Sequence, residues 1–105
     1  MQPTRAMEDM SNILPSGSSD TEILRELGNR LRALRRSRKM SQIEAARLSG
    51  ISRRTLYNAE RGDNPTLLTV MRLLRTYGRL GAIDDFIPVP EVSPIAVIEG
   101  RTRLG

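Results

Sequence analysis

Arginine is the side chain with which this sequence could do most of its chemistry. Of the 17 basic residues in the 105-residue chain, 16 are arginine and one, Lys39, is lysine. A guanidinium can form two parallel hydrogen bonds with a phosphate or with the O6 and N7 atoms of guanine. A GC-rich genome would also favour arginine. Cysteine and histidine are absent, so the usual zinc ligands and the usual general base near neutral pH are missing.

No group of residues predicts an enzyme. Asp84 and Asp85 are adjacent carboxylates without a partner, and we expect them in a loop or at a helix cap. We therefore predict no enzymatic activity, no metal and no cofactor. No apolar run approaches the ~18 residues of a membrane span, and the N-terminus lacks a charged-then-apolar signal pattern. These features predict a cytoplasmic protein with no membrane partner.

Positive charge is concentrated in one segment. Residues 22–62 contain 11 Lys and Arg against 4 Asp and Glu, a net of +7, whereas the whole chain carries +5. Such a cluster is the electrostatic footprint that binding to nucleic-acid phosphates requires. A solvated basic surface is the alternative interpretation.

Composition divides the chain into three parts. Residues 1–19 are polar and end in a Pro-Ser-Gly-Ser-Ser linker, which predicts a flexible N-terminal arm. Residues 20–87 carry helical patterns and form the predicted domain. Residues 88–105 contain three prolines and predict a Pro-rich C-terminal tail.

Five helices are predicted in residues 20–87. The first is capped by Asp20 or Thr21 and carries a leucine stripe at three- and four-residue steps. This stripe consists of Leu24, Leu27, Leu31 and Leu34. The second helix opens at a capping box formed by Ser41 and Glu44 and ends at Gly50. The positions expected to point inward from it are Ile43, Ala46 and Leu48.

The third helix begins after Ser52, buries Leu56 and Ala59, and ends at Gly62. Thr66 caps a fourth helix, whose apolar face is too broad for one neighbour and predicts a second subunit against it. This face comprises Leu67, Val70, Met71, Leu74 and Tyr77, widened by Leu68 and Leu73. Residues 82–87 predict a short fifth helix. Its inward positions are Ile83, Phe86 and Ile87.

The second and third helices have the features of a helix-turn-helix. Two helices that cross steeply need a small residue at their closest approach, here Ala46, and a glycine in the turn, here Gly50. The inward positions are Ala45, Ile51, Leu56 and Ala59. A helix-turn-helix lays the first turns of its second helix in the major groove of DNA. A helical bundle without this function is the alternative.

Residues 40–62, MSQIEAARLSGISRRTLYNAERG, resemble the lambda-repressor-like (Cro/repressor, or XRE) helix-turn-helix family. The resemblance covers residues 21–87 and implies an all-α, five-helix DNA-binding domain. It reaches neither the N-terminal arm nor the tail. Ala45-Ala46 stands where many members have Leu-Ala, which implies a thinner core at that point.

The resemblance also implies roles for individual residues. Arg53 and Arg54 match base-contacting positions, where arginine can pair with guanine. Tyr57 and Asn58 follow one turn later on the groove side, and Asn58 is suited to adenine. The implied DNA-backbone contacts are Gln42, Ser52 and Arg61.

Arg35 and Glu60 match a structural pair that links the first helix to the third in relatives. For Tyr57, packing on the helix surface is the alternative interpretation. For the two arginines of the first turn, plain solvated charge is the alternative.

A single motif contacts only a few base pairs, so specific recognition predicts a homodimer on a two-half-site, double-stranded DNA operator. We expect the dimer surface on the fourth helix and residues 80–87. The chain is also similar to small antitoxins of the Hip type, which implies autorepression and a kinase-like toxin as partner. A phage-type or other stand-alone repressor is the alternative. A protein-interaction adaptor with the same fold is an alternative of another class, and Arg53, Arg54 and Arg61 argue against it.

The tail contains a short apolar run, Ile95 to Ile98. It could add as a strand to the edge of a partner protein. A tail that stays mobile is the alternative.

Overall fold

The computed structural model describes residues 14–91, and every regular element in that range is a helix. The elements are α2 (Asp20–Ser37), α3 (Gln42–Ser49), α4 (Arg53–Arg61), α5 (Leu67–Thr76) and α6 (Ala82–Phe86). The predicted all-α, five-helix fold is confirmed for these residues. Residues 1–13, most of the predicted arm, and residues 92–105 with the apolar run Ile95–Ile98 lie outside the described range.

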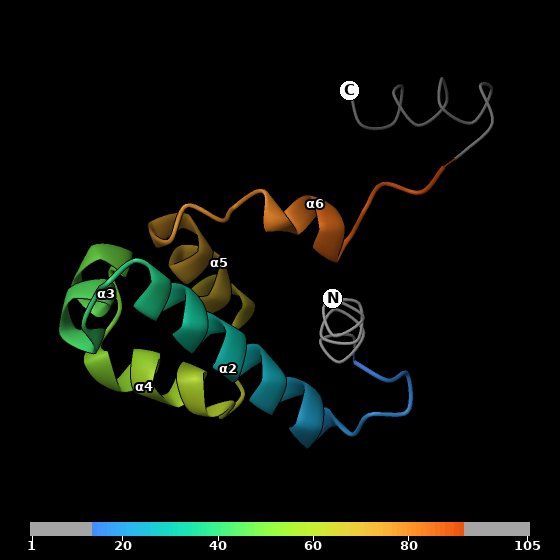
Figure 1. Cartoon of the computed structure of the whole chain (residues 1–105), viewed down its shortest axis with the longest axis horizontal. Helices are drawn as coiled ribbons and strands as arrows, with labels where there is room; N and C mark the ends of the chain where they lie inside the picture. The colour runs from blue at the N-terminus through green and yellow to red at the C-terminus, as the bar shows by residue number, and fades with distance from the viewer. Residues whose placement is uncertain (1–13, 92–105) are drawn as a thin grey trace, which may run out of the picture.

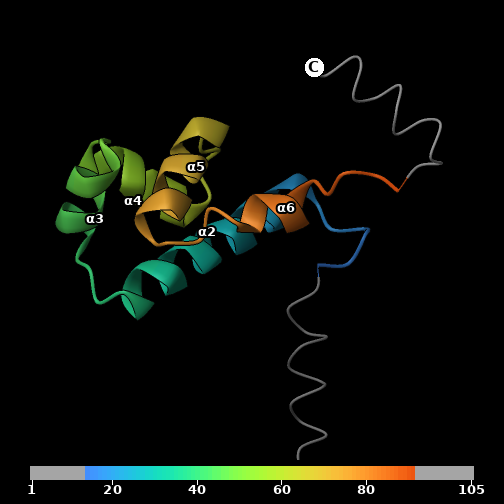
Figure 2. The ribbon, with the colours of Figure 1, turned by 90° about the horizontal axis from the view of Figure 1, so that it is seen from above.

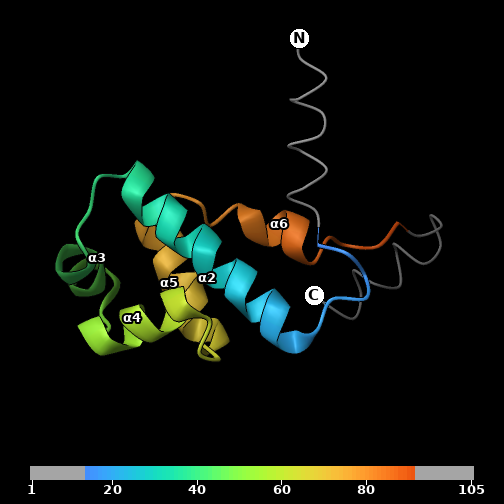
Figure 3. The same cartoon turned by 60° about the horizontal axis from the view of Figure 1, so that its bottom comes forward.

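The long helix α2 forms one side of the domain, and α4 lies alongside it (Figures 1 and 3). Helix α3 packs against α4 and α5, and α4 also contacts α5. Helix α6 follows α5 after a loop and lies apart from α3 and α4 (Figures 1 and 2). The order helix, short helix, turn, helix places α4 at the edge of the domain, where one of its faces stays exposed. Within residues 14–91, no helix combines the length and apolarity that crossing a membrane requires.

Side-chain caps fix the starts of four helices. Ser41, Ser52 and Thr66 each accept a hydrogen bond from the amide three residues later, as predicted. The cap of α2 is Ser19, not Asp20 or Thr21: Ser19 Oγ accepts from Glu22 N at 3.2 Å and Glu22 Oε1 accepts from Ser19 N at 2.8 Å. These bonds hold the pKa of the Glu22 carboxyl below its usual value. Of the capping box predicted at Ser41, one hydrogen bond is present: Glu44 N donates to Ser41 Oγ at 3.1 Å. The reciprocal bond from Ser41 N to the Glu44 carboxylate is not formed within residues 14–91.

The predicted ends of α3 and α4 are confirmed. Gly50 and Gly62 are left-handed, with φ of 69° and 78°, which a glycine adopts at little steric cost. Gly62 also lies close to α2, because a Cβ there would be 2.7 Å from the Leu24 carbonyl oxygen. The turn at Gly50 is open, with nothing within 4 Å of such a Cβ.

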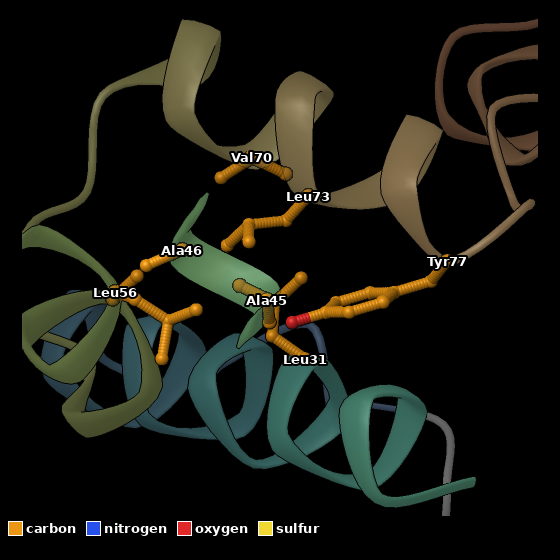
Figure 4. Close-up of a cluster of buried hydrophobic side chains, with 8 residues drawn as sticks. Leu31, Ala45, Ala46, Leu56, Val70, Leu73 and Tyr77 are labelled. Atoms are coloured by element: carbon orange, nitrogen blue, oxygen red, sulfur yellow. The ribbon is translucent and has the colours of Figure 1, made fainter. Parts of the chain in front are cut away.

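The core is formed by four large side chains, one each from α2 and α4 and two from α5 and its end, with alanines between them (Figure 4). The large ones are Leu31, Leu56, Leu73 and Tyr77. Ala45, Ala46 and Ala59 allow the helices to approach closely, and Val70 completes the cluster. Of the leucine stripe, Leu31 is buried, Leu27 and Leu34 are partly buried against the same cluster, and Leu24 is partly exposed. The α2 stripe therefore faces the core as predicted.

The inward positions predicted on α3 are confirmed at Ala45 and Ala46 and wrong at Ile43 and Leu48. Ile43 is 63% exposed and Leu48 50% exposed, while Ala45, Ala46 and Ser49 are buried. The buried positions follow a one- and four-residue spacing, so the two larger side chains fall on other sides of the helix. Small residues are buried here because α3 is wedged between α4 and α5.

The apolar face of α5 is divided between the core and the surface, and α6 is present as predicted, but two of its three predicted inward positions are exposed. Leu73 is completely buried at the centre of the α5 face, whereas Leu67 and Leu68 are more than half exposed. Phe86 and Ile87 do not point inward: they are 61% and 70% exposed. Within residues 14–91, no residue of this five-residue helix is buried.

Candidate nucleic-acid interface

The first turn of α4 presents two exposed arginines. Ser52 holds the start of this turn, since its Oγ accepts from Thr55 N at 3.0 Å and donates to Thr55 Oγ1 at 2.8 Å. Arg53 and Arg54 follow directly and point out of the domain, and this turn carries no acidic residue. No ion pair neutralises either guanidinium within residues 14–91. Both side chains are therefore available to an acceptor outside the chain.

Tyr57 lies one turn further along the same side of α4. Its ring centroid is 5.8 Å from the guanidinium carbon of Arg54 and 5.5 Å from that of Arg61. Arg61 Nη1 also donates to the Tyr57 hydroxyl at 3.2 Å, and this contact raises the pKa of Arg61. The two cation–π contacts hold the ring against the helix surface. Tyr57 therefore packs on the helix surface and still remains 39% exposed.

Arg53, Arg54 and Tyr57 together line a shallow open hollow on the outer face of α4. Asn58 does not line it and is half-buried on the neighbouring side of the helix. The four residues predicted to contact bases therefore divide into a group of three and one residue beside it.

Gln42, predicted to contact the DNA backbone, is engaged within the protein. Its Nε2 donates to Glu60 Oε1 at 3.2 Å. Glu60 in turn forms an ion pair with Arg35, which also donates from Nη1 to the Met40 carbonyl at 2.9 Å. These contacts join the start of α3 to α2 and α4. The amide of Gln42 is thereby held beside the amino end of α3.

Two arginines outside the predicted set have structural contacts that sequence analysis missed. Arg38 Nε donates to the Tyr77 carbonyl at 2.9 Å, where α5 ends. Arg72 Nη1 donates to the Gly50 carbonyl at 3.3 Å, where α3 ends. Both satisfy carbonyls that a helix leaves without a partner at its end. Their partners lie 39 and 22 residues away, so no local sequence pattern could indicate them.

The exposed face of α4 contains groups suited to DNA rather than to catalysis. Within the described residues, no three His, Cys, Asp or Glu side chains are grouped where they could hold a metal ion. The face offers guanidiniums, a phenol and an amide, all of which donate hydrogen bonds to bases or phosphates. A helix of this kind, following a short helix and a glycine turn, defines a DNA-binding helix-turn-helix protein.

Comparison with known families agrees with this class. A family model described as helix-turn-helix matches residues 31–80, which span the last part of α2, from Leu31 on, and all of α3, α4 and α5. This match supports a lambda-repressor-like (XRE-type) helix-turn-helix domain in the matched segment, of the kind found in DNA-binding transcription regulators. The domains of this family are non-enzymatic. No curated protein matches the chain.

Proposed function

We propose that the protein binds a specific double-stranded DNA operator through Arg53 and Arg54. The observation that carries this proposal is their position: both are exposed in the first turn of α4 and unpaired within residues 14–91. Arginine in that position can donate two hydrogen bonds to O6 and N7 of a guanine in the major groove. The amino end of α4 adds a positive dipole at the same place.

The other predicted contacts fit the same placement of α4 in the major groove. Tyr57 and Asn58 contact bases one turn deeper along α4. Ser52, Arg61 and Gln42 contact the DNA backbone and fix the register of the domain on the duplex. Binding by Gln42 requires only the face of its amide that Glu60 does not occupy.

We propose that two copies bind together. A single α4 contacts few base pairs, so useful specificity requires two half-sites. Exposed apolar side chains on α5, α6 and the segment between them support this, because isolated chains seldom leave such a surface uncovered. This surface, the α5–α6 apolar face, comprises Leu67, Leu68, Leu80, Phe86 and Ile87.

The experiment that tests operator recognition is selection from a random duplex library, followed by footprinting of the enriched site. We expect a sequence with two symmetric half-sites, one helical turn apart or a multiple of it, and two protomers on each duplex. Equal binding to all duplexes would contradict sequence recognition. Absence of DNA binding at physiological salt would favour the protein-interaction adaptor.

We further propose autorepression as an antitoxin, with a phage-type or other stand-alone repressor as the competing role. The proposal depends on the tail, residues 88–105, most of which lies outside the described range. A kinase-like protein encoded beside this gene should form a complex with the full chain. Deleting the tail should abolish that complex and leave operator binding intact. A neighbouring protein that does not bind would assign the stand-alone role.

A further inference from the structure

An open groove lies beside the carboxyl end of α4, away from the hollow formed by Arg53, Arg54 and Tyr57. Helix α2 lines it with Thr21, Arg25, Asn29 and Arg32, and the end of α4 lines it with Arg61 and Asp63. The two helices run side by side along this groove (Figure 3). Because Arg25 and Arg32 are seven residues apart, they lie two helical turns apart on one side of α2.

The charge of the groove is positive after its internal pairs are taken into account. The Glu60 carboxylate also borders it, but Arg35 binds both of its oxygens. Asp63 lies 3.7 Å from Arg61. Arg25 and Arg32 are exposed and form no ion pair within residues 14–91, although Arg25 lies close enough to Glu22 to lower its pKa. With Glu60 paired to Arg35 and Asp63 paired to Arg61, the charges of Arg25 and Arg32 make the groove positive.

The contents of the groove favour phosphate over other ligands. Apart from the two paired carboxylates, its lining side chains are guanidiniums, the Asn29 amide and the Thr21 hydroxyl, all of which donate hydrogen bonds to anionic oxygens. The arginines are spread along α2 instead of converging on one point, which suits a chain of phosphates better than a single small anion. The groove also adjoins α4, whose other end carries the base-contacting arginines.

We propose that this groove is a second DNA contact, which binds the phosphates of the DNA backbone that flank the bases contacted by α4. Arg25 and Arg32 are its distinctive residues, and Arg61 is shared with the backbone contact already assigned. The proposal rests on the proposed function, because it assumes that α4 lies on DNA. It extends the interface from the helix-turn-helix to the side of α2.

The test is the salt dependence of DNA binding by the full-length chain. Removing one arginine–phosphate interaction should reduce the slope of log affinity against log salt by about 1, so the slope of the Arg25→Gln/Arg32→Gln double variant should fall by about 2. Affinity for the operator and for random duplex should fall by the same factor, because phosphate contacts carry no sequence information. Ethylation of the flanking phosphates should interfere with binding by the wild type but not by the double variant.

Arg30→Gln is the matched control for Arg32→Gln. Arg30 is exposed on another side of α2, does not line the groove and pairs with Glu26 at 2.8 Å. The Arg30→Gln variant should have the same salt slope as the wild type. An unchanged slope in the double variant, or an equal change with Arg30→Gln, overturns the groove proposal while the function of α4 stands. If the double variant shows the expected lower salt slope but the wild-type protein binds all duplexes equally, the operator proposal is overturned and the groove proposal stands.

Discussion

Arg35 and Glu60 form a two-pronged ion pair between α2 and α4, 25 residues apart in the sequence. Arg35 Nε lies 2.6 Å from Glu60 Oε2, and Nη2 lies 3.1 Å from Oε1. Both residues are only 8% exposed, and the hydrogen bonds with Glu60 raise the pKa of the Arg35 guanidinium. The pair holds the two helices at a fixed distance and gives Gln42 an acceptor. A contact in the interior thus sets the position of a side chain on the proposed DNA surface.

Removing one member of this pair should be strongly destabilising. Glu60→Ala leaves the Arg35 guanidinium buried without a counter-charge, which costs about 3–5 kcal/mol of the free energy of unfolding. Replacing both residues, as in Arg35→Met/Glu60→Leu, should cost less than Glu60→Ala alone, because no charge remains buried. Urea unfolding of the three proteins measures this. A double variant at least as unstable as Glu60→Ala would show that the pair acts through packing and not through charge.

Glycine replacements at the ends of α3 and α4 should differ in severity. Gly50→Ala should cost about 1–2 kcal/mol, the price of a left-handed backbone alone, since a Cβ at Gly50 meets nothing. Gly50→Val should cost more, because a β-branched side chain tolerates positive φ poorly. Gly62→Ala should cost more than Gly50→Ala, because its Cβ would also meet the Leu24 backbone at 2.7 Å.

Thermal unfolding of these variants provides the comparison. Equal losses of stability at Gly50 and Gly62 would mean that α2 moves freely away from α4. Gly28→Ala supplies an independent check on that contact, because its Cβ would lie 2.5 Å from the Glu60 carbonyl oxygen. We expect it to be at least as damaging as Gly62→Ala.

The sequence predicts what is determined locally. The caps Ser41, Ser52 and Thr66 and the stop at Gly62 depend on residues within one turn, and all four were predicted. Ser19 was missed although Ser19 and Glu22 have the spacing of a capping box. The preference for Asp20 or Thr21 ignored the reciprocal bond, which makes an earlier start more favourable.

What depends on distant neighbours could not be predicted in the same way. Ile43 was predicted to point inward but is 63% exposed, because only small side chains such as that of Ala45 fit between α3 and its neighbours. The contact of Gln42 with Glu60 spans 18 residues. Gly28 lies within a helix and not in a turn, so the sequence gives no sign of its role. A glycine is needed there because the backbone of α4 lies against it where the two helices cross.

A charge on the α5–α6 apolar face should dissociate the proposed dimer without unfolding the domain. Phe86 is 61% exposed and outside the core, so Phe86→Glu has little effect on a single chain. Between two copies it would bury an unpaired carboxylate. Sedimentation equilibrium should show a monomer with unchanged circular dichroism. Val89→Glu, a matched change at a 92% exposed residue, should have a smaller effect. A dimer that persists with Phe86→Glu would move the interface elsewhere.

Arg53→Ala and Arg54→Ala should each weaken operator binding by about 1–3 kcal/mol and relax preference at one base pair in each half-site. The reason is their exposure in the first turn of α4, where no carboxylate among residues 14–91 forms an ion pair with them. Competition binding with single-base operator variants measures the preference. Arg47, exposed on α3, provides a control in Arg47→Ala. A uniform weakening on all duplexes, with preference intact, would reassign both arginines to phosphates.

Tyr77 should make the domain sensitive to alkali. Burial, with a smaller contribution from the Glu60 charge, raises the pKa of Tyr77 to about 12, while Arg35 acts in the opposite direction. In the unfolded chain the phenol titrates near its ordinary value of about 10. The raised pKa means that the folded state keeps its proton while the unfolded state loses it. The stability contributed by the neutral phenol is therefore complete below about pH 10 and is lost as the pH rises toward 12.

Comparison with Tyr77→Phe isolates this effect, because the two proteins differ only in the hydroxyl group of residue 77. The Tyr77 hydroxyl is buried without a hydrogen-bond partner among residues 14–91, so at pH 7 the variant should be more stable by about 1 kcal/mol. Between pH 9 and pH 12 the wild type should lose about 1–2 kcal/mol more than the variant. Urea unfolding across this range measures the difference. Parallel stability curves would mean that the phenol ionises as readily in the folded chain as in the unfolded one, and that Tyr77 is more accessible to water than its 1% exposure indicates.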